Sequence, residues 1–497
     1  MTKELRRLSI LMLVMFLALF GSTSVIQVFQ ADNLAANPNN RRALYDSYEV
    51  QRGSIIAGGT AIASSVPSDD VYSWQRTYVD ADMWAPVTGY LNPVLGSATG
   101  LEQAMNQQLS GTGNSQFFSR IERIVTGQPP RGSNVEITVD PAVQRAAYDA
   151  LGDLQGAVVA IEPSTGLILA MVTSPSFDTN ALASHDSNAV ASTYDTLVSD
   201  PTNPLYNRAI GGNLNPPGST FKLVVASAAL ASGNYTRDSQ FPNVAEYTLP
   251  GTSTSIRNAG GGTCGGGETV SIADALRLSC NIPMAELAVQ LGDDAIRDEA
   301  KKYGFDTSFS IAQGLTASDS QQPLSSTPSV YPTEALSDDK TALTGFGQGD
   351  VRATPLQMAM VSAGIANDGV VMNPRIVDSV IAPDLTVEQP FESTEFGRAL
   401  ESDAASEMTS MMVANVQDGA ASGARIEGVD VAGKTGTAEN GNTRPYTLWF
   451  TGFAPANDPQ VAVAVVVENG GGQGQSGSGN TLAAPIAKKV MEAVLGR

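Results

Sequence analysis

An uncharged and mostly apolar run from about Leu8 to Phe29 is the feature that most limits how this chain can fold. A spanning α-helix needs about 20 such residues. The run follows three basic residues, which favour a cytoplasmic N-terminus: Lys3, Arg6 and Arg7. We therefore expect residues 8–29 to form a transmembrane anchor, with residues 1–7 as a cytoplasmic tail.

A cleaved signal peptide is the alternative interpretation of this run. Its apolar core would be about 7 to 15 residues long and would precede a small-x-small cleavage site. The run is longer than that, and no clear site follows it. Arg41 and Arg42, on the expected outer side, depart from the charge rule. Since no second run of comparable length follows, we expect a single-pass protein of the cell membrane, with nearly all of the chain outside the cytoplasm.

Charge and cysteine content exclude some classes of site. The formal net charge of -21 argues against a nucleic-acid partner, because binding phosphates requires clustered Lys and Arg. Cys264 and Cys280 could pair outside the cytoplasm, closing a loop worth about 3 kcal/mol, or they could remain two free thiols. With these two cysteines and one histidine, His185, a structural zinc site is excluded, and we expect no metal and no cofactor.

The pattern of apolar residues divides the part after the anchor into two regions. Residues 30–153 are mixed and polar, with short apolar runs broken by Gly, Pro and Asn, and predict an elongated domain of strands and loops. Residues 154–497 contain the predicted hairpin GAVVAIEPSTGLILAMVTSP, the later strands TLWFTGFAP and QVAVAVVVENG, and several helices. This order predicts an α+β domain. The Gly/Ser/Gln segment from Gly470 to Asn480 is expected to be a flexible connector.

The stretch NPPGSTFKLVVASAAL, Asn215 to Leu230, places a lysine among apolar residues. A buried amine loses its proton unless it is paired, and a neutral lysine is a base. In a helix from Ser219 to about Ala231, positions three apart are neighbours, so Lys222 can take the proton of the Ser219 hydroxyl. The one histidine lies in a polar, loop-like stretch, which argues against a Ser-His-Asp hydrolase.

The order of three elements distinguishes this serine from chance matches. Ser337 and Lys340 also form S-x-x-K, but their acidic neighbours predict a charged, exposed lysine. Ser219-x-x-Lys222 is followed by Ser279-Cys280-Asn281 and then by Lys434-Thr435-Gly436-Thr437. The pattern S-x-N recurs elsewhere in the chain, so that motif taken singly indicates little. The three motifs in this order are specific.

On these motifs the chain resembles the penicillin-recognising serine acyltransferases, and among them the monofunctional class B penicillin-binding proteins. The likeness extends through NRAIGG, LSCN, GQGDVRATPLQMAM and GKTGTAE to the C-terminal helix, and so covers most of residues 155–497. The anchor, RGSI and SATGLEQAMNQQLSG resemble the N-terminal part of actinobacterial members of that family. The resemblance implies a serine β-lactamase-like transpeptidase domain, with an antiparallel sheet flanked by helices, after a non-catalytic pedestal or dimerisation-like domain.

The resemblance also implies a role for each motif residue. Ser219 would attack the D-Ala-D-Ala bond with Lys222 as its base, Ser279 would relay the proton to the leaving D-alanine, and Lys434 would keep the site electropositive. The backbone N–H groups of Ser219 and Thr437 would form the oxyanion hole. Substrate would be held by four residues, with an edge strand accepting the stem peptide as an added strand: Asn281, Thr435, Gly436 and Thr437. A bridge from Cys264 to Cys280 would brace the loop against the site.

Several other functions fit parts of the sequence. Gly428 to Thr435 satisfies the G-x-x-x-x-G-K-T pattern, but a nucleotide site needs a helix at Lys434, where a strand is predicted. A D,D-carboxypeptidase or a β-lactamase would use the same triple with water as acceptor, although no E-x-x-L-N element follows Ser279. From a different class, the chain could be a β-lactam sensor or a catalytically inactive division scaffold. The resemblance favours a transpeptidase of cell division that β-lactams acylate.

The N-terminal region is too short for a glycosyltransferase domain and lacks the motifs of that domain. Glycan polymerisation would then come from a partner in the membrane or in a division complex. Residues 30–153 would either raise the active site from the membrane or dock this partner, and the sequence leaves both alternatives open.

Overall fold

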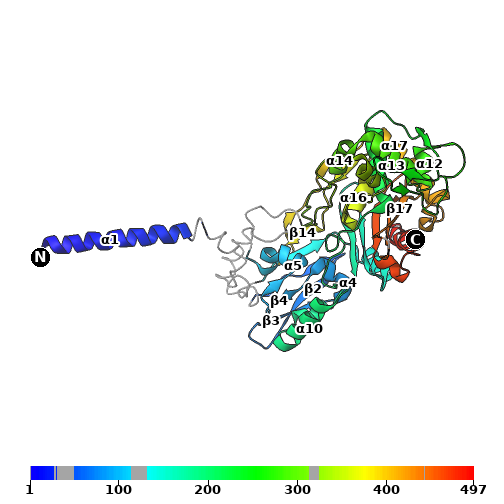
Figure 1. The fold of residues 1–497 in the computed structure, drawn as a ribbon. Helices are drawn as coiled ribbons and strands as arrows, with labels where there is room; N and C mark the ends of the chain where they lie inside the picture. The colour runs from blue at the N-terminus through cyan, green and yellow to red at the C-terminus, as the bar shows by residue number, and fades with distance from the viewer. Residues whose placement is uncertain (1, 27–29, 31–49, 113–130, 313–323, 442) are drawn as a thin grey trace.

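The computed structural model describes residues 2–26, 30, 50–112, 131–312, 324–441 and 443–497. Helix α1 (Thr2–Ser24) lies apart from the rest of the chain in Figure 1 and contains a stretch of 20 residues, Leu5–Ser24, that is long and apolar enough to cross a membrane. It also includes the basic residues expected in a cytoplasmic tail, because Lys and Arg are good helix formers and hydropathy does not mark a helix start. The expected end of the span, residues 27–29, and Arg41 and Arg42 lie outside the described residues.

The sheet nearest the N-terminus has six strands in the order β15-β14-β6-β1-β2-β3. Its strands β1 (Ile55–Ala57) and β6 (Asn134–Ile137) are parallel, and the other neighbours are antiparallel. The sheet is completed by two segments from much later in the chain, beside the early β2 (Thr60–Pro67) and β3 (Trp74–Tyr78): β14 (Val377–Ile381) and β15 (Val387–Pro390). Residues that the sequence assigned to the second region thus build the first sheet, since a strand's own residues do not specify a distant partner.

The second sheet has five antiparallel strands in the order β17-β18-β19-β7-β8. They are β7 (Gly156–Ile161), β8 (Ile168–Ser174), β17 (Ala432–Ala438), β18 (Thr447–Ala454) and β19 (Val461–Val467). All residues of β18 and β19 are buried, as expected for continuous apolar strands covered on both faces. Strand β17 is at one edge, so one side of its backbone has no neighbouring strand in this sheet.

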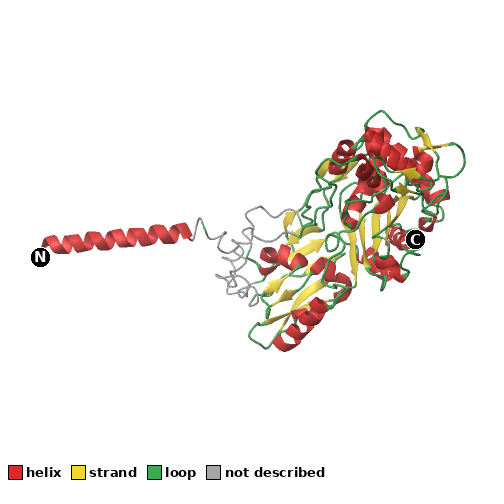
Figure 2. Ribbon diagram, viewed as in Figure 1, coloured by secondary structure: helices red, strands yellow, loops and turns green. Residues whose placement is uncertain are grey.

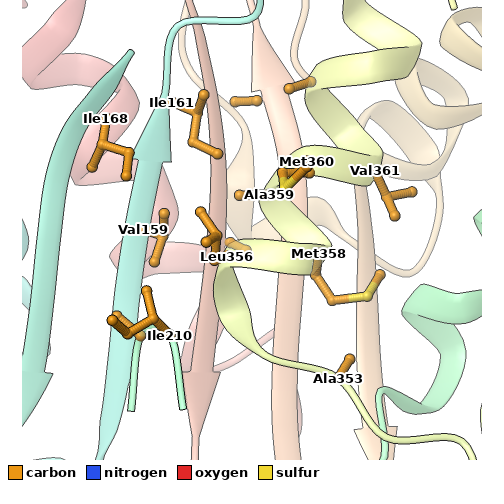
Figure 3. Close-up of a cluster of buried hydrophobic side chains, with 14 of the residues drawn as sticks. Val159, Ile161, Ile168, Ile210, Ala353, Leu356, Met358, Ala359, Met360 and Val361 are labelled. Carbon is orange, nitrogen blue, oxygen red and sulfur yellow. The ribbon is translucent and has the colours of Figure 1, made fainter. Parts of the chain in front are cut away.

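Helices cover both faces of this sheet (Figure 2). On β7, Val159 and Ile161 belong to the core shared with α16 (Pro355–Ala366), as Figure 3 shows, while Val158 belongs to a second core with α8 (Pro141–Leu151) and α18 (Ala483–Val494). Alternate residues of one strand therefore face two separate cores. The start of α8 follows the predicted Asp-Pro signal, because the Asp140 carboxylate accepts hydrogen bonds from the N–H groups of Ala142 and Val143.

A group of helices lies beside the edge strand β17. It comprises α11 (Lys222–Ala231), α12 (Ile272–Arg277), α13 (Ile282–Leu291), α14 (Asp293–Lys302), α15 (Asp338–Thr344) and α17 (Ser402–Asp418). The short turns are η3 (Gly218–Phe221), η4 (Ser422–Ala424) and η5 (Asn469–Gly472). Helix α12 begins where the sequence predicted, with Ser271 as its N-cap.

The other helices and strands lie outside the two large sheets. Helices α6 (Asn106–Ser110) and α9 (Thr179–Ala183) contact strands of the first sheet, α10 (Ser187–Ser199) packs on α9, and α4 (Ala81–Thr88) contacts both α5 (Gly100–Ala104) and strand β8 of the second sheet. The remaining strands pair two by two: β4 (Leu91–Asn92) with β5 (Ser97–Ala98), β9 (Gln240–Pro242) with β12 (Thr269–Ser271), β10 (Tyr247–Thr248) with β11 (Ser255–Ile256), and β13 (Val370–Met372) with β16 (Glu395–Arg398).

Candidate active site

The predicted nucleophile lies in a short 3-10 turn. Ser219 belongs to η3 and α11 begins at Lys222, whereas the sequence predicted one continuous helix from Ser219, because a 3-10 start to a helix has no distinct apolar pattern. Gly218 has φ +54°, a left-handed conformation that favours glycine, and a Cβ atom there would lie 3.1 Å from the Cβ of Ala438. The turn therefore brings Ser219 close to strand β17.

Side chains from the second sheet hold this turn in place. The Trp449 indole donates to the Pro216 carbonyl over 2.9 Å. The Asn215 side chain donates to the Glu468 carboxylate over 2.9 Å and accepts from the Thr447 hydroxyl over 3.3 Å. Glu468 in turn accepts from the side chains of two residues far away in sequence, Gln155 (2.7 Å) and Arg208 (3.2 Å). Sequence analysis missed these supports, since NRAIGG signalled only family likeness and not a contact.

Lys222 is fully buried, and its amine points toward the Ser279 loop. Its Nζ donates to the Ser279 carbonyl (2.7 Å) and to Oδ1 of Asn281 (2.9 Å). Burial lowers the pKa of the Lys222 amine well below 10.5, and the nearby charge of Lys434 lowers it further. A neutral amine has two N–H donors and one lone pair, so these two bonds leave the lone pair available. Within the part of the chain that the structure describes, neither Nζ nor any other group hydrogen-bonds the Ser219 hydroxyl.

Ser279 lies between the two lysines of the site. Lys434 donates to the Ser279 hydroxyl over 2.6 Å and to the Thr435 carbonyl over 2.9 Å, while Lys222 binds the Ser279 carbonyl. Ser279 has φ +61°, which is rare for a residue with a side chain and is found where the surroundings enforce it. Burial lowers the pKa of Lys434 to about 7, so this amine is charged for part of the time at neutral pH.

The residues around Ser279 are tied to the glycine-rich loop before α12. Cys280 forms a disulfide with Cys264, whose Cα atom is 5.8 Å away, and both are buried. The Asn281 side chain donates to the Arg257 carbonyl over 3.1 Å, and its backbone N–H donates to Oδ1 of Asn258 over 2.8 Å. One N–H of the Asn281 amide is left for a substrate, because Lys222 binds the oxygen and Arg257 takes the other N–H.

The two threonines of β17 differ in what their hydroxyls can do. Thr435 is buried, and its hydroxyl donates to the Ala420 carbonyl over 3.1 Å, so it must rotate before it can donate to a carboxylate. Thr437 is exposed, and its hydroxyl oxygen accepts from the Gly479 N–H over 3.3 Å, which leaves its own hydrogen free. Gly479 belongs to the segment expected to be a flexible connector. The segment packs on the edge of the sheet, since a Cβ on Gly479 would lie 2.3 Å from the Trp449 carbonyl of β18 and 2.4 Å from the Gly436 carbonyl of β17.

Gly436 lies directly beneath the nucleophile turn. A Cβ atom at Gly436 would lie 2.8 Å from the Pro217 carbonyl, so a side chain here would push the turn away. The other matches to motifs lie elsewhere. Ser337 and Lys340 are exposed at the start of α15, as predicted, and Lys434 lies inside a strand, which contradicts a nucleotide-binding loop.

The arrangement can perform acyl transfer. It offers a hydroxyl on a tight turn, a buried amine of lowered pKa three residues away, a second hydroxyl between two amines, and a strand at the edge of the sheet beside them. These are the parts of a nucleophile, a base, a proton relay and a surface for an extended peptide.

Comparisons with known proteins give a consistent picture. The family model described as "Penicillin binding protein transpeptidase domain" matches residues 156–492, and "Penicillin binding protein A dimerisation domain" matches residues 52–135. The peptidoglycan D,D-transpeptidase PbpA of Mycolicibacterium smegmatis is 42% identical over 100% of this chain and 99% of its own length. The protein of that name from Mycobacterium tuberculosis is 40% identical over the same shares.

Solved structures extend the likeness to three dimensions. The ceftriaxone acyl-enzyme complex of penicillin-binding protein A from M. tuberculosis superposes with a TM-score of 0.84 at 40% identity, covering 91% of this chain and 100% of that one. The penicillin G acyl-enzyme complex of the same protein gives a TM-score of 0.82 at 39% identity, over 90% and 100% of the two chains.

Proposed function

The chain belongs to the penicillin-binding protein transpeptidase family, and we propose that Ser219 is the nucleophile through which it cross-links peptidoglycan stem peptides. It is an enzyme of the same class as its full-length relatives, a peptidoglycan D,D-transpeptidase of cell-wall synthesis that β-lactams acylate. The observation that carries the assignment of residues is the position of Ser279 between Lys222 and Lys434.

The first half-reaction forms the acyl-enzyme. Ser219 Oγ attacks the carbonyl carbon between the two D-alanines, and its proton moves to the neutral Nζ of Lys222. The C–N bond then breaks, and the terminal D-alanine leaves as an amine after it takes a proton through the Ser279 hydroxyl. Two backbone N–H groups, of Ser219 and Thr437, stabilise the tetrahedral oxyanion by on the order of 3 kcal/mol each.

The second half-reaction forms the cross-link. The amine of an acceptor stem peptide attacks the acyl carbon, gives a proton back through the same groups, and releases Ser219. Lys434 keeps the Ser279 hydroxyl oriented by its 2.6 Å hydrogen bond and supplies positive charge for the substrate carboxylate. The free hydroxyl hydrogen of Thr437 supports its role as the first carboxylate donor, with Thr435 joining after it leaves Ala420.

The donor peptide lies along the open edge of β17. Gly436 lets the nucleophile turn lie close against this strand, and Asn281 donates its remaining N–H to a substrate carbonyl. β-Lactams acylate Ser219 as mimics of this peptide. The acyl-enzyme structures of the M. tuberculosis relative support this part of the proposal.

Labelling with benzylpenicillin tests the assignment of the nucleophile. Intact-mass analysis of the full-length protein should show one stable adduct, and peptide mapping should place it on Ser219. A Ser219→Ala variant should acquire no adduct. An adduct that persists in that variant would move the nucleophile elsewhere, and rapid loss of the label from the parent protein would indicate a β-lactamase or carboxypeptidase.

The apolar helix α1 supports attachment of the enzyme to the membrane. We assign α1 to a single span with the N-terminus in the cytoplasm and the catalytic domain outside, and division as the process that the enzyme serves. Glycan polymerisation then comes from a glycosyltransferase partner, for which the region matched by the dimerisation-domain model is the candidate docking surface.

Deleting residues 31–153 would not test docking cleanly, because β14 pairs with β6 and would lose its neighbour. Two exposed apolar residues of this region offer a milder test, Val71 (84% exposed) and Val79 (54% exposed). If the region docks a partner, Val71→Glu combined with Val79→Glu should reduce recruitment to the division site without reducing penicillin labelling. Unchanged recruitment would favour a spacer.

A further inference from the structure

Asn415, near the C-terminal end of α17, is a fully buried amide that binds the end of the helix preceding Ser279. Its Nδ2 donates to the carbonyls of Leu276 (2.9 Å) and Arg277 (2.6 Å), which end helix α12. Both amide hydrogens are thus used on the last turn before Ser279. The Oδ1 atom is buried and has no hydrogen-bond partner among the described residues, so the position uses the amide for its donors.

The carbonyls that Asn415 holds control the backbone of Ser279. The Ser279 N–H donates to the Leu276 carbonyl over 3.2 Å, so one oxygen receives both Ser279 and Asn415. The left-handed φ of Ser279 is unfavourable for a residue with a Cβ and persists only where neighbours fix it. Asn415 supplies part of that fixation.

The turn after α17 connects the same helix end to the strand that carries Lys434. The Ala420 N–H donates to the Arg277 carbonyl over 3.0 Å, and the Ala420 carbonyl accepts from the Thr435 hydroxyl over 3.1 Å. At Gly419 a Cβ atom would lie 2.1 Å from the Arg277 carbonyl, so the two backbones meet without space for a side chain. The end of α17 therefore connects the Ser279 loop to β17 through hydrogen bonds on both sides.

We propose that Asn415 is a positioning residue that sets the Ser279 hydroxyl against Lys434 for proton transfer. The inference rests on the proposed function, because it requires Ser279 to relay a proton. It concerns a residue outside the three motifs, which acts through two carbonyls and touches neither substrate nor Ser219. Loss of its two donors leaves the end of α12 free to shift, and the 2.6 Å contact between Lys434 and Ser279 lengthens.

The test is a double-mutant cycle in the full-length protein, with the second-order rate of acylation by a fluorescent penicillin as the readout. Asn415→Leu keeps the approximate size of the side chain and removes both donors. We expect the acylation rate to fall by roughly 10- to 100-fold, the range for a small misplacement of a reacting group. In a Ser279→Ala background the same substitution should have no further effect, because the group that it positions is already absent.

Gln417 provides the matched control on the same helix. Its side chain bonds Asp430 over 2.8 Å at the surface, so Gln417→Leu should leave the acylation rate unchanged. Should Asn415→Leu fail to fold, Asn415→Ser, which keeps one hydroxyl donor, enters the same cycle. A rate within twofold of the parent, or effects of the two substitutions that multiply, would overturn the inference. Labelling of Ser219→Ala would instead overturn the proposed function and is scored separately.

Discussion

Two places in the molecule bury a pair of cationic side chains, and they do so in opposite ways. Near the first sheet, Arg52 donates through Nε to Oε2 of Glu102 and Arg76 donates through Nε to Oε1, both over 2.6 Å. All three side chains are buried. In the active site, Lys222 and Lys434 are equally buried, but neither forms an ion pair with a carboxylate in the described part of the chain.

The difference shows how one chain uses buried charge for structure and for chemistry. Burial alone would raise the pKa of Glu102, but Arg76 and Arg52 outweigh it and hold that pKa below its ordinary value, so the group stays ionised. Burial lowers the pKa of both active-site amines, with nothing to restore it. A compensated triad fixes a conformation, whereas uncompensated amines give up their protons more readily, and an amine without its proton can accept one from a hydroxyl.

The largest expected effect is on acylation when the base is removed. Lys222→Met should lower the acylation rate by roughly 10²- to 10⁴-fold, the usual contribution of a general base, while the folded state is retained because a desolvated amine is replaced by an apolar chain. Stopped-flow fluorescence of penicillin binding, together with thermal unfolding, measures both quantities. Lys340→Met, in the exposed second S-x-x-K match, is the control. Acylation near the parent rate in Lys222→Met would remove the base from the mechanism.

Removing the Glu102 carboxylate should lower the stability of the protein and leave the acylation rate unchanged. Glu102→Gln leaves two buried guanidinium groups facing a neutral amide, and we expect a loss of about 3 to 5 kcal/mol in the free energy of unfolding. The acylation rate of the folded fraction should not change. Denaturant unfolding of the full-length protein in detergent measures the loss. The surface pair of Lys488 and Glu492, 3.8 Å apart, gives the control, since Glu492→Gln should cost less than about 1 kcal/mol.

The sequence predicts the residues of the proposed chemistry better than the residues that hold them in position. Ser219, Lys222, Ser279 and Lys434 occur in short motifs whose order is informative, and the apolar runs of β18 and β19 predict strands directly. Asn415 and Glu468 act through a few hydrogen bonds with residues that are far away in sequence. An amide in a helix and an acid at a strand end have many possible roles, and no local pattern selects among them.

The same limit applies to the first sheet and to the triad. The sequence analysis assigns the residues of β14 and β15 to the second region, together with the residues around them. Alternation of apolar residues predicts a strand but does not identify its neighbour in a sheet. Glu102, in the stretch LEQAM, has the appearance of a solvated helix position. Only the three-dimensional arrangement brings it between two arginines that are 50 and 26 residues away.

Removing the second amine should change the pH dependence of the active site. The rate of acylation should rise with pH as Lys222 loses its proton, because only the neutral amine is a base. Lys434→Met removes a positive charge that lowers the pKa of Lys222, so the rising limb should move to higher pH. Acylation rates between pH 5 and 10 measure this shift, and Lys488→Met is the control. A limb that stays in place would mean that the two amines are not coupled.

The smallest effect separates charge from geometry in the triad. Arg52 also donates to Oδ1 of Asn106 and to the Glu102 carbonyl, both over 2.5 Å. Arg52→Lys keeps the positive charge but loses the fork of donors, and we expect a cost of about 1 to 2 kcal/mol, comparable to one or two hydrogen bonds. The same unfolding measurement that is used for Glu102→Gln gives the comparison. If Arg52→Lys costs as much as Glu102→Gln, hydrogen-bond geometry and not charge compensation holds the triad. A clearly smaller cost means that the buried arginines depend most on the charge of the carboxylate, a partner that Lys222 and Lys434 lack among the described residues.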